Sequence, residues 1–302
     1  MHTGFSPLIG QLAALLAAFL WAVSSVLFKR LGTVIRPLEL NLLKGVLAVI
    51  LMLLTSLLLG EQFAGLSLAV VLWLMLSGAL GIGFGDTMYF EALNQLGARR
   101  TLLLGILAPP LASLIAAIVL GETLTLSAWG GILLTMLGVA WVITEQPEDG
   151  TLQRRHLWRG VLFGFLAALT QAIGAVISHW ALTRTPVSSL QSAIIRLLAG
   201  ILFLLLWAAL RRQKLGAWIK PGSTLRMWAI ILLAVLIGTY LAIWLQQFAF
   251  QHANVGIAQT LLATSPLFIL PISAVMREKV SLRAVLGVLV STAGICLLFL
   301  VA

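Results

Sequence analysis

The stretch LGARRTLLLGILAPPLASLIAAIVLGETLT, residues 96–125, carries no charge between Arg100 and Glu122. An uncharged apolar run of this length is typical of a transmembrane helix, which needs roughly 20 residues to cross the hydrocarbon core of a bilayer. Two prolines, Pro109 and Pro110, lie near the middle of the run. A proline inside a helix removes a backbone hydrogen bond, so the stretch predicts a membrane span with an interruption halfway along it.

Apolar runs of the same kind recur along the whole chain, which has 302 residues, 61% of them hydrophobic and 9% charged. The first run, 8–28, is too long for a signal peptide and has no basic leader. The fold class predicted is therefore all-α and integral to a membrane. The ten spans are expected at 8–28, 37–59, 67–91, 98–120, 125–144, 158–181, 187–210, 225–250, 255–276 and 281–301.

Positive charge divides the loops between these spans into two sets. Sixteen of the 19 lysines and arginines lie in or beside the odd-numbered loops, whereas the even-numbered loops hold only Arg184; Lys44 and Arg196 lie inside spans. Lysine and arginine collect in cytoplasmic loops. The bias predicts cytoplasmic odd-numbered loops and two extracytoplasmic termini, in a bacterial-type inner (plasma) membrane. It also accounts for the net charge of +10 without a nucleic acid partner.

The two halves of the chain repeat each other across their last two spans, at an offset of 156 residues. Corresponding loops of the two halves carry opposite charge bias, which is expected when a unit of five helices is repeated upside down. The repeats predicted are 1–146 and 157–302. The matched pairs are Pro110 and Pro266, Glu122 and Glu278, Thr125 and Ser281, Leu126 and Leu282, Gly131 and Gly287, and Gly138 and Gly294.

The chain resembles the EamA-type members of the drug/metabolite transporter superfamily. The residues that carry the resemblance are FLW at 19–21 with Ser24 and Ser25, the basic Lys44 and Arg196, the stretch 96–125, GGILLTMLG at 130–138 and NVGIAQTLLATSPLFILPISAVMREKVS at 254–281. The resemblance covers both repeats. It implies a secondary carrier for small metabolites, often an exporter, that works without ATP. Such carriers are usually drawn with cytoplasmic termini, the reverse of the orientation that the loop charges predict here.

Polar side chains at helical spacing predict the lining of a path at the interface of the repeats. In the eighth span Tyr240, Trp244 and Gln247 share one face, and the offset of 156 places Glu91 opposite Gln247. Such a lining suits a small polar or zwitterionic solute, for example an amino acid or an amine. Two alternatives stay open, a solvated Glu91 at a helix end and a polar stripe that joins helices by hydrogen bonds. The substrate-binding candidates are Trp21, Ser24, Ser25, Glu91, Gln171, Arg196, Tyr240, Trp244, Gln247 and Gln259.

Charged side chains inside the spans need a separate explanation. A charge there costs roughly 2.5–3.5 kcal/mol even on the lenient insertion scale, so Asp86 and Lys44, which lie at similar depth, are expected to pair. The pair is either structural or a protonatable site, with protons as the candidate coupling ion. Arg196 has no acidic partner in its own half and is the candidate for holding a carboxylate or phosphate. The candidate hinge residues are Pro109, Pro110 and Pro266.

The function predicted is a secondary active transporter, and specifically an exporter, of a small metabolite by alternating access around a central site. One alternative is a flippase of a lipid-linked metabolite. A second is an intramembrane protease, because GFGD at 83–86 resembles the GxGD of such enzymes, but their chemistry needs two aspartates and the only other one, Asp149, lies in a hydrophilic loop. No motif for a metal, a cofactor or a catalytic nucleophile is present. The sequence does not specify an oligomeric state.

Overall fold

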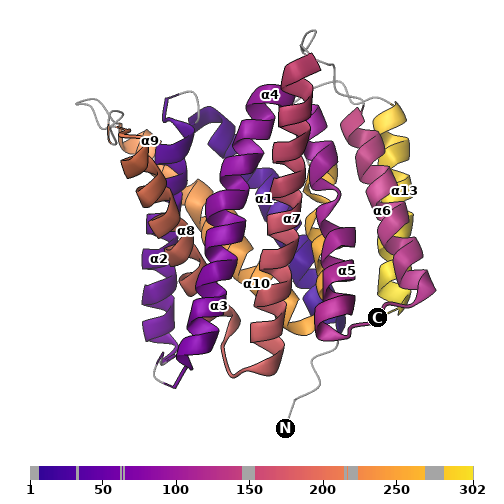
Figure 1. The fold of residues 1–302 in the computed structure, drawn as a ribbon, viewed down its shortest axis with the longest axis horizontal. Coiled ribbons are helices and arrows are strands. Elements are labelled where there is room, and N and C mark those ends of the chain that lie inside the picture. The colour runs from indigo at the N-terminus through magenta and orange to yellow at the C-terminus, as the bar shows by residue number, and fades with distance from the viewer. Residues whose placement is uncertain are drawn as a thin grey trace.

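The computed structural model describes residues 7–31, 34–61, 63, 65–144, 154–213, 216, 224–268 and 282–301, and the regular secondary structure in this part of the chain is helical (Figure 1). The first repeat contains α1 (Pro7–Leu31), α2 (Pro37–Leu58), α3 (Leu68–Gly78), η1 (Ala79–Gly85), α4 (Asp86–Gly105), α5 (Ala108–Leu120) and α6 (Leu126–Thr144). The second contains α7 (Arg154–Arg184), α8 (Ser189–Leu210), α9 (Leu225–Val235), η2 (Leu236–Leu241), α10 (Ala242–His252), α11 (Val255–Leu262) and α13 (Leu282–Val301).

These helices account for the ten predicted spans. In the described residues, seven apolar helices are at least 18 residues long, and three shorter apolar helices occupy the positions of the fifth, ninth and tenth spans. Helix α4 (Asp86–Gly105) continues beyond 91, the predicted end of the third span, and includes the first residues of the predicted fourth span. The chain is therefore a multi-pass membrane protein.

Helix α1 shows how the sequence sorts lipid from protein. Leu8, Leu12, Leu16 and Phe19 are exposed, and they follow one another at steps of three or four residues, so they form one face of the helix. The opposite face carries alanines, which are buried against other helices. Leucine gains little from leaving lipid, whereas small side chains let helix backbones approach closely, so the alanine face packs inward and the leucine face meets the membrane.

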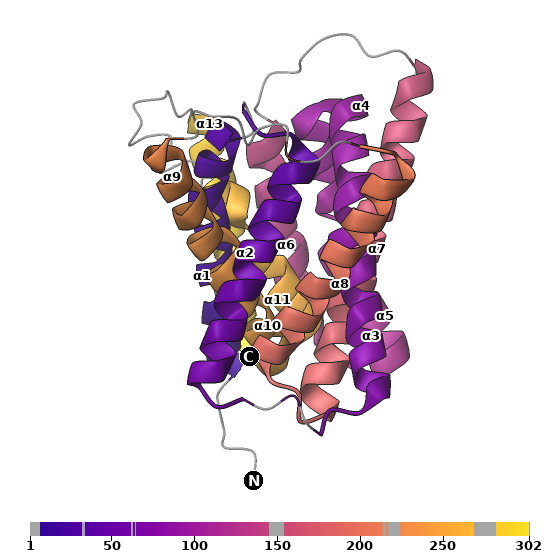
Figure 2. The ribbon, with the colours of Figure 1, turned by 90° about the vertical axis from the view of Figure 1, so that its left-hand side faces the viewer.

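The second repeat is inverted relative to the first. Helix α1 starts at the end of the bundle where both termini lie, and its counterpart α7 starts at the opposite end (Figures 1 and 2). We call the end with the termini the terminal face. We call the opposite end the basic face, because helix ends that flank the odd-numbered, arginine- and lysine-rich connections lie there. Helices end at Leu31, Thr144 and Leu210 on the basic face, and at Leu58, Leu120, Arg184 and His252 on the terminal face.

The last helices of the two repeats, α6 and α13, pack on each other through residues that correspond across the repeat. A Cβ atom added to Gly138 would lie 2.4 Å from the backbone nitrogen of Ser291, and one added to Gly294 would lie 2.4 Å from the backbone nitrogen of Thr135. The Ser291 hydroxyl donates a hydrogen bond of 3.1 Å to the Thr135 carbonyl. These contacts are possible only because glycine has no side chain.

Four spans are interrupted, at positions that match between the repeats. The third and eighth spans contain the π-helices η1 and η2, in which the backbone is wound more widely than in an α-helix. The fourth span breaks between Gly105 and Ala108, and the ninth breaks after Leu262, before Pro266. Pro109 and Pro110 stand in the first turn of α5, where proline costs no helical hydrogen bond. The sequence predicted that these prolines interrupt a helix from within, whereas the interruption lies just before them.

Candidate functional site

Two adjoining cavities lie between the repeats, one of about 650 Å³ and one of about 460 Å³. Volumes of this size are typical of sites for small molecules. Seven residues line both cavities, so the two form one branched space. These shared residues are Trp21, Ser25, Gly81, Asp86, Tyr89, Gln171 and Gln246.

The cavities occupy the half of the bundle nearer the basic face. In α1 they are lined by residues of the second half of the helix, from Trp21 to Phe28, whereas Ala13 and Ala17 of the first half belong to the buried core. In α7, which runs the other way, the lining ends at Gln171, and the core begins with the next residue. The half nearer the terminal face is therefore packed shut in this conformation.

Charge is concentrated in the larger cavity. Lys44 from α2, Asp86 from α4 and Arg196 from α8 all line it. The Asp86 carboxyl group lies within electrostatic range of both cations and within hydrogen-bonding reach of Asn41. With two cations and one anion, the described lining has a formal charge of +1, so it attracts one further negative charge.

Arg196 is the most enclosed of these three groups. Its side chain is 2% exposed, and its Nε and Nη1 atoms have no hydrogen-bond partner among the described residues. A buried donor without a partner typically costs 1–3 kcal/mol, and more for a charged group. The guanidinium is thus a buried, incompletely satisfied cation in the lining of the larger cavity.

Glycines of the third span make room for this arginine. A Cβ atom on Gly78 would lie 2.2 Å from the carbonyl oxygen of Arg196, so the backbones of α3 and α8 touch here. A Cβ atom on Gly81 would lie 3.4 Å from Nη2 of Arg196 and 3.1 Å from Oε1 of Gln171. The guanidinium and the glutamine amide therefore face each other across a glycine of η1.

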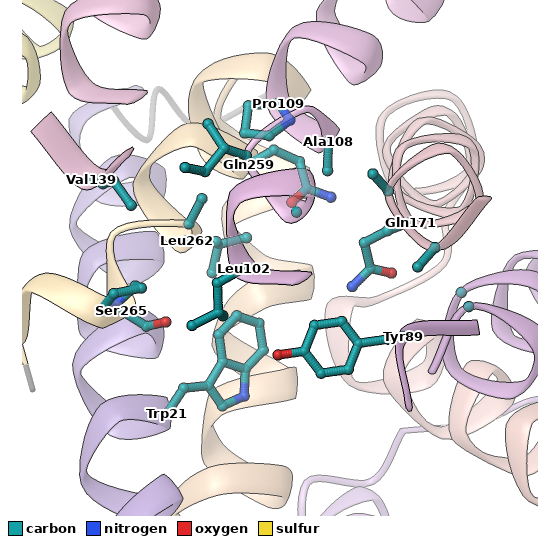
Figure 3. A pocket seen from close by; sticks show the side chains of 18 of the residues that line it. Trp21, Tyr89, Leu102, Ala108, Pro109, Val139, Gln171, Gln259, Leu262 and Ser265 are labelled. Carbon is teal, nitrogen blue, oxygen red and sulfur yellow. The ribbon is translucent and has the colours of Figure 1, made fainter. Parts of the chain in front are cut away.

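The smaller cavity is uncharged apart from Asp86 at its border. In Figure 3 the Tyr89 hydroxyl points toward the Trp21 indole from the other side of the space. The indole Nε1 donates a hydrogen bond of 3.0 Å to the carbonyl of Gly238 in η2, which ties α1 of one repeat to the π-helix of the other. Gln171 and Gln259 add amide groups to the wall, and Nε2 of the buried Gln259 has no partner among the described residues.

The structure brings most of the predicted site residues together, from both repeats. The hinge candidates Pro109 and Pro266 also border the space, next to the breaks in their spans. The predicted residues that line one cavity or both are Trp21, Ser24, Ser25, Lys44, Asp86, Pro109, Gln171, Arg196, Gln259 and Pro266.

Five predicted residues lie outside both linings: Glu91, Pro110, Tyr240, Trp244 and Gln247. The stripe on the eighth span joins helices instead. The Tyr240 hydroxyl is 2.8 Å from the Thr55 hydroxyl, Trp244 donates to Ser189 at 3.2 Å, and the Gln247 carbonyl accepts from Ser192 at 2.9 Å. These residues hold η2 against α2 and α10 against α8, which is the alternative that the sequence left open.

Several polar cavity residues were not predicted. Gln246, Tyr89 and Asn41 line the space, but no helical stripe in the sequence singles them out. Gln246 is adjacent to the predicted Gln247, and one residue corresponds to a rotation of about 100° around a helix axis. The repeat offset identifies the correct helix but does not identify its inner face.

No group of three or more His, Cys, Asp or Glu side chains that could hold a metal ion occurs in the described parts of the chain. The recognisable chemistry of the space is that of hydrogen bonds and charges.

Comparison with known proteins identifies a family and a solved structure that this chain resembles. A family model for the EamA-like transporter family matches residues 8–144 and again residues 158–300. The fold is similar to that of a solved crystal structure with a TM-score of 0.78, 18% sequence identity, and coverage of 97% of this chain and 98% of the other; at this identity the likeness concerns the fold alone. No curated protein matches the sequence significantly.

Proposed function

Because the chain belongs to the EamA-like transporter family, we propose that it is a secondary active carrier that exports a small polar or zwitterionic metabolite through the branched cavity. The family match makes the chain a transporter of the drug/metabolite type. The solute, the direction and the coupling are our proposal, supported by the geometry of the cavity.

Arg196 is the observation that carries the proposed substrate class. Its guanidinium is buried and has unsatisfied N–H groups in a lining whose net charge is positive. A carboxylate or phosphate accepts two parallel hydrogen bonds from arginine, and such charge-assisted bonds are about twice as strong as neutral ones. A substrate that carries an anionic group would bring the charge of the lining to zero.

Asp86 supports a zwitterion in preference to a simple anion. An amino group bound near this carboxylate would compete with Lys44 for it, while the substrate carboxylate binds Arg196. The uncharged branch, with Trp21, Tyr89 and Gln259, would then accommodate the body of the solute. An amino acid meets all three requirements. An amine without an acidic group meets only the second and third.

The same carboxylate is our candidate for proton coupling. A proton on Asp86 would remove the anion that balances Lys44 and Arg196, and a substrate carboxylate would restore the balance. A purely structural Asp86–Lys44 pair is the alternative, and it predicts a carrier whose transport does not depend on the proton gradient.

The interrupted spans support alternating access. Discontinuous helices at the repeat interface typically form the substrate sites of secondary carriers, around which one repeat moves against the other. Here η1, η2 and the breaks before Pro109 and Pro266 border the cavity from both repeats. We propose that these four points absorb the rearrangement that moves access from one face to the other.

We place the basic face in the cytoplasm of a bacterial-type inner membrane, with both termini outside, because of the loop charges. The cavity then lies on the cytoplasmic side, as expected for an exporter waiting to load. A reporter that fluoresces only in the cytoplasm, fused after Ala302, should stay dark; a fluorescent fusion would reverse the orientation and place the cavity on the outer side.

The test of the substrate class uses purified protein in detergent. A panel of amino acids, amines, nucleosides and sugar phosphates is screened for an increase in thermal stability, because a ligand that binds the folded state raises its melting temperature. Solutes with a carboxylate or phosphate should stabilise the wild type and lose most of this effect in Arg196→Gln. The matched control is Arg184→Gln, an exposed arginine at the terminal face. Stabilisation by amines alone, unchanged in Arg196→Gln, would refute the proposed anion site.

Two other functions are tested by the same preparation. A flippase would transfer a labelled lipid-linked sugar between the leaflets of a reconstituted vesicle, and it would require a cavity open to the lipid. A protease would cleave a tethered peptide and lose this activity in Asp86→Asn; its second aspartate would have to be Asp149, which lies outside the described residues.

A further inference from the structure

Away from the cavity, one imidazole connects three segments at the terminal face. His179 of α7 is hydrogen-bonded through Nδ1 to the backbone carbonyl of Phe250 in α10, and through Nε2 to the carboxylate of Glu122. Glu122 lies in the turn between α5 and α6, and its other oxygen accepts a bond of 3.4 Å from the Asn254 amide. The cluster of His179, Glu122, Phe250 and Asn254 therefore joins a turn of the first repeat to two helices of the second.

The cluster lies where the bundle is packed shut. The His179 and Glu122 side chains are 7% and 21% exposed. Ala175 and Val176, one helical turn before His179, belong to the buried core that closes the terminal half. Access from the terminal face requires α7 to separate from α10 and from the α5–α6 turn, and such a movement breaks both hydrogen bonds of His179.

The partners of His179 determine how many protons the cluster holds. A backbone carbonyl and a carboxylate can only accept hydrogen bonds. A ring whose two nitrogens both face acceptors must therefore carry a proton on each nitrogen, unless the second proton lies on the carboxyl group. In either case one proton is held between Nε2 and Glu122. Its loss leaves a nitrogen lone pair facing a carboxylate, which is repulsive.

The surroundings of Glu122 favour the ionised carboxylate. Burial raises the pKa of Glu122, but the hydrogen bond and the charge of His179, together with hydrogen bonds from Asn254 and the backbone of Val255, hold this pKa below its usual range. The environment therefore stabilises Glu122 in its charged form, and the contact with His179 is a charge-assisted hydrogen bond.

We propose that the His179–Glu122 cluster is a proton-binding site that is separate from the substrate cavity, and that its protonated form latches the terminal face shut. Deprotonation converts the attraction between α7 and the α5–α6 turn into repulsion and favours opening. The inference rests on the proposed function, because a latch matters only in a carrier that alternates.

Other ionisable groups near α7 do not replace this pair. In the described residues, α3, α5 and α11 bring no ionisable side chain to α7. Helix α10 brings His252, whose Nδ1 is hydrogen-bonded to the Phe248 carbonyl at 2.9 Å, and α7 itself ends with Arg184. Helix α8 brings Arg196, and α4 carries Asp86, Tyr89, Glu91, Arg99 and Arg100; of these, Arg196, Asp86 and Tyr89 line the cavity in the other half of the bundle.

The test is a labelling experiment that needs no substrate. A cysteine at Ala181, a fully buried residue half a turn beyond His179, reports opening of the terminal face in a Cys296→Ser background. The full-length protein in detergent is treated with a water-soluble maleimide from about pH 5 to about pH 8, the range in which histidine side chains change charge. Thiol reactivity itself rises with pH, so the quantity compared is the ratio of labelling rates between this protein and the same protein carrying Glu122→Gln.

Glu122→Gln is the informative variant, because a glutamine amide can donate to the neutral imidazole at Nε2 and so keeps the latch closed without a titrating proton. The ratio should be near one at the acidic end and rise by roughly tenfold at the alkaline end, which corresponds to a tenfold change in the opening equilibrium. A ratio that stays constant across the range would overturn the proposal. His179→Gln, whose amide donates to Glu122 at every pH, should behave in the same way and replaces Glu122→Gln if that variant does not fold.

The outcome is separable from that of the proposed function. Arg196→Gln should leave the labelling ratio unchanged, because Arg196 lies in the cavity. A pH-dependent ratio in a protein that binds no compound of the panel would support the latch and refute the substrate class. A labelling ratio that does not change with pH, in a protein that binds amino acids through Arg196, would refute the latch and support the substrate class.

Discussion

The contact between Gly78 and Arg196 leads to the sharpest prediction. A Cβ atom at Gly78 would lie 2.2 Å from the carbonyl oxygen of Arg196 and 2.6 Å from its Cα. Non-bonded heavy atoms prefer separations of about 3.5–4.0 Å. Both obstructing atoms belong to the backbone and cannot rotate away, so Gly78→Ala must push α3 and α8 apart by about 1 Å.

The magnitude follows from two opposing effects. Overpacking of a close contact costs about 1–3 kcal/mol, and replacing a mid-helix glycine by alanine returns up to about 1 kcal/mol of helix propensity. The net loss expected is about 1–2 kcal/mol, equivalent to a fall of a few degrees in melting temperature. The shift also displaces the backbone that carries the guanidinium, so carboxylate-bearing ligands should bind about tenfold more weakly, as expected for a loss of about 1.4 kcal/mol.

The measurement is thermal unfolding in detergent, with and without the best ligand of the panel. Gly130→Ala in α6 is the matched control, because its Cβ atom would lie 3.7 Å from Cδ2 of Leu297, an ordinary contact. This variant should be as stable as the wild type or slightly more so, and it should bind normally. If Gly78→Ala melts at the same temperature as Gly130→Ala and binds equally well, the close approach of α3 to Arg196 is wrong.

Three further predictions concern single interactions. Lys44→Met should destabilise the protein by about 1–3 kcal/mol, because the Asp86 carboxylate then loses one of its two nearby cations. Asp86→Asn in the same chain should restore most of the loss; equal melting temperatures for the single and the double variant would exclude the pairing. The pKa of Glu122 is lower in the folded than in the unfolded protein. The stabilisation from Glu122 is therefore complete above the unfolded pKa of about 4.3 and is lost as the pH falls through the folded pKa. On acidification the melting temperature should fall less steeply in Glu122→Gln than in the wild type, and parallel curves would contradict the assignment. Trp21→Phe removes the bond to the Gly238 carbonyl and should cost about 1 kcal/mol while slowing solute exchange in reconstituted vesicles; unchanged exchange would show that this link does not couple the repeats.

Much of the candidate site could be predicted from the sequence because charge inside a membrane is rare. Asp86, Lys44 and Arg196 stand out from apolar neighbours, and the cost of burying each of them restricts where they can lie. The structure places all three on one cavity. The aromatic and amide candidates were less certain, since the same residue types line a cavity, anchor a helix or join two helices.

The eighth span shows where this reasoning fails. Gln247 and Trp244 were chosen because they share a helical face, and that face packs on α8 through hydrogen bonds to Ser192 and Ser189. The cavity instead receives Gln246 and Ile243, one position earlier. A helical period shows that two residues point the same way, but it does not show which neighbour they point toward. The π-helix η2, which the sequence did not reveal, also turns the helix after it relative to an uninterrupted α-helix.

The sequence by itself determined the membrane spans, the duplication and the opposed charge bias of the repeats. Hydropathy, prolines and basic residues are features of short segments, and they can be identified without knowing which helices pack together. Only the tertiary structure decided which side chains meet across the repeats. The backbone contact of Gly78 with Arg196, the Trp21–Gly238 bond and the His179–Glu122 pair each join residues more than 50 positions apart. Such pairs depend on the rotation and spacing of whole helices, which the close packing of small residues sets and no local pattern encodes.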